Sequence, residues 1–241
     1  MNKKRWIKNR PEYERPREKL LKFGSKDLSN SELLAIFLRI GVKDKSAIQL
    51  AAEILEKFGG IRGLCTAEIE NLLNIKGLGV AKVAQLKATL ELAERYLKED
   101  VKQKSIVESS KEVLNYLHHS MQDLDYELMK VILLDGQNQI INIVDLFRGS
   151  INSSSVYPRE IIKLALKYSA LAIVIVHNHP SGISKPSEDD KKLTKEIIFA
   201  CISAGIKVHD HIIIGNKKHY SFADEGIIDA YEKEYKRRMK L

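Results

Sequence analysis

Residues 171–190 read LAIVIVHNHPSGISKPSEDD, and this stretch decides the fold of the second half of the chain. Its first six residues form a continuous apolar run, which is typical of a strand buried on both faces of a sheet. Because alternate side chains of a strand point to one face, His177 and His179 are expected on the same side at its end. Gly182 and two prolines then turn the chain, and a helix is predicted from about Ser187.

The polar residues of this stretch form a pattern typical of a catalytic metal site. Asp190 falls in the first turn of the predicted helix, where its carboxylate can face the histidine pair. Two imidazoles and one carboxylate leave a fourth tetrahedral position open, as in catalytic rather than structural zinc sites. We therefore predict one Zn²⁺ ion per chain with His177, His179 and Asp190 as ligands. Zinc is preferred over iron or manganese because these nitrogen and oxygen donors are borderline ligands.

Simpler interpretations of the same residues stay open. A histidine pair can lie on a surface by chance or anchor a loop through hydrogen bonds. Ser187 and Asp190 at this spacing also form a capping box, which needs no metal. Pro180, Ser181 and Gly182 fit ordinary loop chemistry without any catalytic role.

The remainder of the second half alternates predicted strands and helices. Strands are expected over residues 127–135 and 139–147 about an Asp-Gly turn, over 208–215, and over 219–224 at a sheet edge. Helices are expected over residues 109–121, 158–170 and 187–204. Mixed strands and helices around one deeply buried strand predict an α/β sandwich with helices packed on a sheet.

The first hundred residues read as helices throughout. Predicted helices cover residues 29–40, 46–60, 67–75 and 80–99. The polar stretch from Glu99 to Ser105 is the best linker candidate. We therefore expect an α+β protein with a helical domain over 1–100, a linker over 101–108 and a metal-binding domain over 109–241.

The distribution of charge, the number of cysteines and the lengths of the apolar runs indicate which partners and which cell compartment to expect. Residues 1–104 hold 22 Lys and Arg against 14 Asp and Glu, whereas residues 105–241 hold 18 of each sign. The excess positive charge in the first part would attract a polyanion, or it serves only solubility. The two cysteines, Cys65 and Cys201, stand far apart, which argues against a disulfide framework or a cysteine-based zinc knuckle. Without an apolar run of about 18–20 residues or a secretory signal, a cytoplasmic protein with no membrane partner is expected.

Residues 73–82, LNIKGLGVAK, resemble a helix-hairpin-helix element. Gly77 and Gly79 would let the backbone turn tightly, and the next helix would present free N–H groups to a phosphate. Lys76 and Lys82 would add charge, so we predict DNA contact that is independent of base sequence and sensitive to salt. The alternatives are a tight turn between two packed helices, or a protein contact through the same element.

Residues 177–190 also resemble the metal motif of the JAMM (MPN-plus) family, which reads His-x-His, seven residues, then Ser-x-x-Asp. The resemblance implies a cytidine-deaminase-like α/β sandwich and an active site in which the Ser187 hydroxyl donates a hydrogen bond to an oxyanion. In that family a glutamate at a strand start is the general acid/base, and Glu127 fits that position. Glu160 and Glu188 are its rivals.

The resemblance extends to the bacterial RadC-type branch of that family. It rests on PREIIKLALKYSALAIVIVHNHPSG, GIKVHDHIIIG and HYSFADEG, and in the helical half on LSNSELLAIFLRIG and LLNIKGLGVAKVAQLKATLELAER. It covers nearly the whole chain except mainly the first dozen and last ten residues. It includes Asp210 and His211, which can orient a ligand or, with His209, form a polar cluster at a strand end. The spacing of His209 and His211 would let both rings share one face.

Three functions follow from these features. The first is a zinc-dependent hydrolase of amide or isopeptide bonds in an unknown peptide or protein substrate, recruited to DNA by the first half. The second is a non-catalytic DNA-binding accessory protein of repair or recombination with a structural metal site. The third, an enzyme acting on nucleic acid itself, is the least favoured because phosphodiester chemistry usually recruits paired carboxylates and two metals. Glu127 and the open coordination position favour the first.

Overall fold

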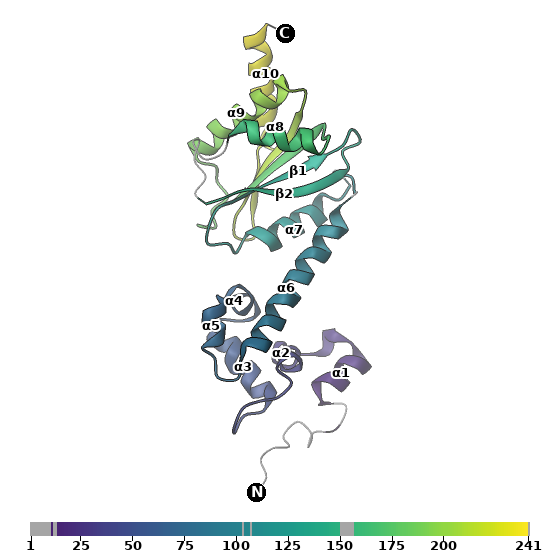
Figure 1. The fold of residues 1–241 in the computed structure, drawn as a ribbon, viewed down its shortest axis with the longest axis vertical. Coiled ribbons are helices and arrows are strands. Elements are labelled where there is room, and N and C mark those ends of the chain that lie inside the picture. Colours follow the sequence, from purple (N-terminus) through teal and green to yellow (C-terminus); the bar gives the residue numbers. More distant parts are fainter. Residues whose placement is uncertain (1–10, 12–13, 103, 107, 150–156, 241) are drawn as a thin grey trace. The chain divides into compact units, whose positions relative to one another are not determined.

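The structure is a computed structural model that describes residues 11, 14–102, 104–106, 108–149 and 157–240. The chain forms two compact units, Met1–Ala93 and Glu94–Leu241. The long helix α6, Val80–Val101, begins in the first unit and ends in the second (Figure 1). The linker predicted over residues 101–108 therefore starts at the last residue of this helix.

The first unit is helical, as predicted. Its elements before α6 are α1 (Pro16–Phe23), a single 3-10 turn at Ser25–Asp27, α2 (Asn30–Leu38), α3 (Ala47–Lys57), α4 (Ile61–Thr66) and α5 (Ile69–Leu73). Helices α2 and α3 each begin with a capping box, in which the N-cap serine and a side chain three residues later satisfy each other's backbone N–H groups. Their apolar faces meet in a core that includes Leu38, Leu50, Ala51, Ile54 and Leu72.

The second unit is built on a five-stranded mixed sheet, which confirms the predicted fold class. The strands are β1 (Leu128–Leu134), β2 (Ile140–Arg148), β3 (Ala172–Asn178), β4 (Lys207–Ile214) and β5 (His219–Ser221), in the order β2-β1-β3-β4-β5. Strand β3 pairs antiparallel with β1 and parallel with β4, so it lies in the centre of the sheet. All seven of its residues are buried, as its continuous apolar run predicts.

Helices cover both faces of this sheet. Helices α8 (Pro158–Lys167), α9 (Glu188–Ser203) and α10 (Ile227–Met239) lie on one face, and α7 (Ser110–Met121) lies on the other (Figure 1). None of the specific predicted helix ranges covers α1 or α4, although the first hundred residues are helical as predicted, and α10 lies outside every predicted range. No helix among the described residues is long and apolar enough to cross a membrane.

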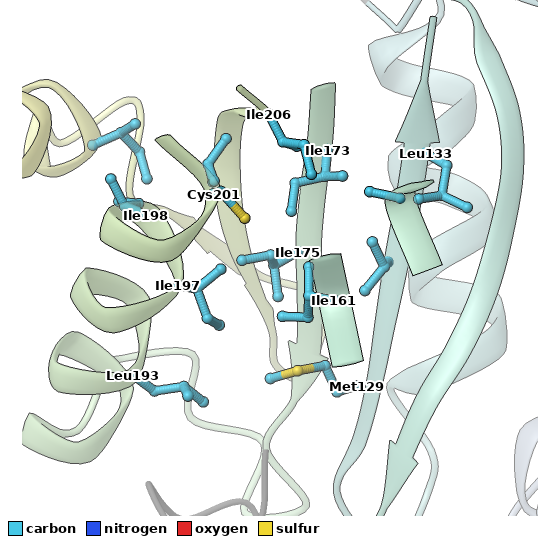
Figure 2. Packing of buried hydrophobic residues seen from close by; sticks show 14 of the residues in the cluster. Met129, Leu133, Ile161, Ile173, Ile175, Leu193, Ile197, Ile198, Cys201 and Ile206 are labelled. Atoms are coloured by element: carbon cyan, nitrogen blue, oxygen red, sulfur yellow. The ribbon is translucent and has the colours of Figure 1, made fainter. Parts of the chain in front are cut away.

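The core between the sheet and α9 holds together the two elements that carry the candidate metal ligands. Ile173 and Ile175 of β3 pack in one cluster with Leu193 and Ile197 of α9 (Figure 2). Each of these four side chains is almost fully buried, and complete burial of such a side chain contributes about 1.5–3 kcal/mol. The end of β3 and the start of α9 are therefore fixed relative to each other by apolar packing below the site.

Candidate metal centre

Strand β3 delivers the two histidines to one end of the sheet. His177 is its second-last residue and is fully buried, and His179 follows directly after the strand. The backbone N–H of His179 donates to the Ile214 carbonyl at 3.0 Å, which ties this position to the end of β4. The centroids of the two rings lie 4.9 Å apart, which confirms the prediction that both histidines lie on the same side at the end of the strand.

The loop after His179 packs tightly against the turn between β4 and β5. Gly182 has a φ of 77°, a left-handed conformation that favours glycine, and its carbonyl accepts from the Asn216 N–H at 2.8 Å. A Cβ added at Gly215 would lie 2.6 Å from that same carbonyl oxygen, so the close approach requires glycine there. The loop thereby returns the chain to the start of α9.

Helix α9 begins with the capping box that the sequence allowed. Ser187 is the N-cap, and its Oγ accepts from the Asp190 N–H at 3.1 Å. The Asp190 carboxylate in turn accepts from the Ser187 N–H at 2.7 Å and from its hydroxyl at 2.6 Å, both on Oδ2. The same carboxylate also faces the histidines, so the capping and metal interpretations of these two residues are compatible.

Three candidate ligand atoms converge at this point. Asp190 Oδ1 lies 3.1 Å from His177 Nε2, Oδ2 lies 3.4 Å from His179 Nε2, and the two imidazole nitrogens lie 3.0 Å apart. Among the described residues, His177, His179 and Asp190 are the one group of three metal-ligating side chains whose donor atoms lie within 4.8 Å of one another. Two neutral imidazoles and one carboxylate suit a divalent cation of the zinc type.

The side chains around Asp190 favour its charged carboxylate. Burial raises the pKa of Asp190, but the hydrogen bonds from His177 and His179 outweigh burial and hold that pKa well below its usual range. The pKa of His179 is raised, first by its hydrogen bond with Asp190 and also by the nearby charge of Glu127. A metal ion at this position would therefore compete with a proton for His179.

A buried layer behind His177 supports its ring. His177 Nδ1 lies 2.8 Å from His211 Nε2, and His211 Nδ1 lies 2.6 Å from the Thr194 hydroxyl. The His211 ring stacks on Phe222 with 5.0 Å between centroids. Burial holds the pKa of His211 well below its usual value, so this ring is neutral. Of these partners, the sequence pointed to His211 but not to Thr194, an ordinary threonine one helical turn after Asp190.

The other members of the predicted polar cluster do not face the metal position. Asp210 accepts from the backbone N–H groups of His211 and Ala223 and from the Ser221 hydroxyl, at 2.6–2.8 Å, so it fastens β4 to the segment after β5. The pairing of β4 with β3 shifts register at His209, which lies 2.6 Å from the Asn138 side chain instead. The expectation that His209 and His211 share a face is therefore wrong, because this bulge breaks the strand alternation.

Glu127 lies at the same end of the sheet as the candidate ligands. It directly precedes β1, where Met129 pairs with His177, and strand alternation places Glu127 on the face that His177 uses. Its contribution to the raised pKa of His179 indicates that its charge lies near the site. Its rivals are occupied elsewhere: Glu160 pairs with Lys163 on α8, and Glu188 is 88% exposed and pairs with Lys191.

Asn178, between the two histidines, holds the chain on both sides of Glu127. Its buried side chain accepts from the Leu128 N–H at 2.7 Å and donates to the Tyr126 carbonyl at 3.0 Å. The peptide groups before and after Glu127 are thus tied to the strand that carries the ligands. The sequence gives no signal for this contact, because the pairing joins residues 50 positions apart.

Asn178→Ala is expected to lower the free energy of unfolding by about 3 kcal/mol, since two backbone groups would lose their partner and each buried orphan costs about 1–3 kcal/mol. Urea unfolding of the metal-free protein measures this. Asn142→Ala on β2 is the control, because among the described residues that side chain accepts just from the next residue's N–H, and its loss should cost less than about 1 kcal/mol. Equal losses in the two variants would contradict the proposed tie.

Of the predicted nucleic-acid residues, Lys76, Gly77 and Gly79 lie on the turn between α5 and α6, and Lys82 lies in the first turn of α6. Gly77 has a φ of 100°, and an added Cβ would lie 2.7 Å from Val42, so the turn requires glycine there. Gly79 has open space around its Cα and no positive φ, so the expectation that it serves the tight turn is wrong. Lys82 Nζ donates to the Gly77 carbonyl at 2.8 Å, and Lys76 is exposed.

Comparison with known proteins identifies relatives of both parts of the chain. Residues 107–227 match the family described as RadC-like JAB domain, and residues 7–84 match the family described as UPF0758 N-terminal. A UPF0758 protein of Saccharophagus degradans is 46% identical over 218 residues, covering 90% of this chain and 97% of that protein. One of Nitrosomonas eutropha is 44% identical over 222 residues, covering 92% of this chain and 99% of its own.

The mixed sheet and the ligand group at the end of its central strand, with the family match, define a protein with a JAB-type domain related to the JAMM family. The RadC-type resemblance is confirmed at this level. The chain belongs to the UPF0758 family, with that family's N-terminal part followed by the RadC-like JAB domain.

Proposed function

We propose that the chain is a zinc-dependent hydrolase of amide or isopeptide bonds in a peptide or protein substrate. The observation that carries this proposal is the convergence of His177, His179 and Asp190 at the sheet end where Glu127 lies. Two imidazoles and one carboxylate leave a coordination position for water or substrate, which a structural zinc site would close with a fourth protein ligand. Membership of a RadC-like JAB family supports the same class of reaction.

In the proposed reaction the metal ligands, Glu127 and Ser187 would each have a separate role. A zinc ion held by His177, His179 and Asp190 would lower the pKa of water and polarise the scissile carbonyl. Glu127 would accept the proton of the attacking water and deliver it to the leaving amine. Ser187 would donate to the developing oxyanion; because its hydroxyl now donates to Asp190, this role requires that the hydroxyl change its acceptor.

Removal of the metal is expected to abolish hydrolysis. The purified chain would be stripped with a chelator, reloaded with one equivalent of zinc, and incubated with a panel of peptides and isopeptide-linked proteins. New amino groups should be released by the zinc-loaded protein and not by the stripped one. Amine release that persists after complete stripping would contradict a metal-dependent reaction.

The leading alternative is a non-catalytic accessory protein that keeps the metal for structure. It would bind zinc, gain stability from it, and release no amine from any member of the panel. The capping box of Ser187 and Asp190 and the packed layer behind His177 already hold this end of the sheet through protein contacts. A purely structural role for the metal is therefore the less favoured of the two.

We further propose that the first unit contacts DNA through Lys76, Gly77, Gly79 and Lys82. The supporting observation is the open space around Gly79. The turn does not require a glycine at this position, and the space would let a phosphate approach the start of α6. The excess of positive charge in residues 1–104 adds a long-range attraction. Such binding would recruit the hydrolase without reading base sequence.

Lys76→Ala is expected to weaken binding to duplex DNA and to reduce the slope of log affinity against log salt by about one. Lys57→Ala on α3 removes the same charge from another exposed position and is the control. Fluorescence anisotropy across a salt series measures both. Equal effects of the two substitutions would leave only a general attraction, and no binding at low salt would exclude the DNA role.

A further inference from the structure

A chain of hydrogen bonds runs behind the metal site without reaching solvent. It starts at His177 Nδ1, passes to His211 Nε2 at 2.8 Å, continues from His211 Nδ1 to the Thr194 hydroxyl at 2.6 Å, and ends at the Asp190 carbonyl at 2.5 Å. His177, Thr194 and His211 each have 0% exposure. The chain thus begins on one candidate ligand and ends on the backbone of another.

The chemistry of the last group gives the chain one direction. A carbonyl oxygen only accepts, so the Thr194 hydroxyl must donate to Asp190 and is left as an acceptor towards His211. His211 then carries its proton on Nδ1 and presents the Nε2 lone pair to His177. His177 must therefore donate from Nδ1, and in the neutral ring the Nε2 lone pair then faces His179 and Asp190.

This direction opposes a competing arrangement at the front of the site. His177 Nε2 lies 3.1 Å from Asp190 Oδ1, so in the metal-free protein the carboxylate would favour a proton on that nitrogen. A proton there would block metal binding, because only the lone pair of a neutral imidazole can bind a metal. The rear chain offers the proton a fully buried acceptor on the opposite side of the ring.

The second candidate histidine ligand, His179, also has its Nδ1 proton fixed by a carbonyl, but through a single hydrogen bond. His179 Nδ1 lies 2.7 Å from the Ile183 carbonyl, to which it can only donate, so when this ring is neutral its Nε2 lone pair also faces the site. In His179 a carbonyl of the loop fixes the proton directly. For His177, the side chains of His211 and Thr194 lie between the ring and the Asp190 carbonyl of α9, which fixes the proton indirectly.

We propose that Thr194 and His211 are positioning residues that hold His177 in the tautomer with its proton on Nδ1. The proposal rests on the proposed function only in requiring that a metal binds at this site. The tautomer itself belongs to the metal-free protein and is measured without any substrate.

Nitrogen-15 NMR of the metal-free protein tests the tautomers directly. At a pH where the rings are neutral, both His177 and His211 should carry the proton on Nδ1. In Thr194→Val, which keeps the shape of the side chain but removes the acceptor, the proton should move to Nε2 in both rings. Protons on Nε2 in the unsubstituted protein would overturn the proposal.

Zinc affinity supplies the second readout. By competition with a chelator, Thr194→Val should bind zinc about 10- to 100-fold more weakly, and Thr194→Ser, which restores the hydroxyl, should recover most of that loss. Unchanged tautomers and affinity in a folded Thr194→Val would also overturn the proposal. If the unsubstituted protein binds no metal, the hydrolase proposal fails, while the NMR result still decides the tautomers.

Discussion

Glu127→Gln is expected to lower the rate of amide hydrolysis by about 100- to 10,000-fold while leaving the zinc content unchanged. Glutamine has nearly the same shape but cannot accept a proton from water or return one to an amine. The candidate ligand atoms come from His177, His179 and Asp190, so the substitution leaves the metal group intact. The backbone around residue 127 is held by Asn178, which keeps the new amide in the place of the carboxylate.

Single-turnover rates of amine release, with zinc measured by mass spectrometry in the same samples, separate chemistry from metal loss. Glu188→Gln is the matched control, because that acid is 88% exposed and pairs with Lys191 on the first turn of α9. It should retain the full rate. Hydrolysis at the unsubstituted rate by Glu127→Gln, with zinc bound, would remove Glu127 from the mechanism.

Asp190→Ala is expected to reduce bound zinc from about one ion per chain to background. In the metal-free protein it should also lower the free energy of unfolding by about 3 kcal/mol, the lower end for removing one partner of a buried ion pair. The lower end applies because Asp190 raises the pKa of His179, which can release its proton once the carboxylate is gone. His177→Ala should lose zinc in the same way, since it also removes one of the three ligands.

The stability effect of Asp190 should depend on pH in a defined window. The pKa of Asp190 is lowered by folding, so its contribution is present above the unfolded value of about 3.9 and is lost as pH falls through the folded value. The pKa of His179 is raised, so its contribution is complete below about 6.5 and is lost as pH rises through the folded value. The loss in Asp190→Ala should therefore be largest between about pH 4 and 6.5.

Ser187→Ala separates helix capping from the ion pair, because it removes the cap but keeps the carboxylate. It should cost about 1 kcal/mol at all pH values in that window. Urea unfolding in the presence of a chelator measures both variants. If Ser187→Ala and Asp190→Ala lose the same stability, the capping box alone explains the role of the carboxylate.

The candidate ligands were predictable because short-range rules place them. His177 and His179 are two residues apart at the end of a buried strand, so strand alternation points them to the same side. Asp190 is three residues after the N-cap Ser187, so the helix start places it in the first turn. The central strand itself was predictable from its uninterrupted apolar run. In each case the physical constraint acts within a few residues of sequence.

The surrounding contacts were not predictable, because they join distant segments. Thr194 carries no unusual local pattern and gains its role from His211 on another strand. The register shift at His209 depends on pairing with β3, so strand spacing alone misplaced that ring. Gly79 repeats the residue type of Gly77, but the difference in their conformations appears only in the folded chain.

The shared use of Asp190 by the helix cap and the ligand group has an evolutionary consequence. A descendant that lost its metal chemistry would still be selected to keep Ser187 and Asp190, because α9 needs its first turn. His177 would be retained by its place in the interior. His179, partly exposed and outside the strand, has the weakest structural reason to persist. Drift at that one position would be the earliest sign that a lineage had abandoned catalysis.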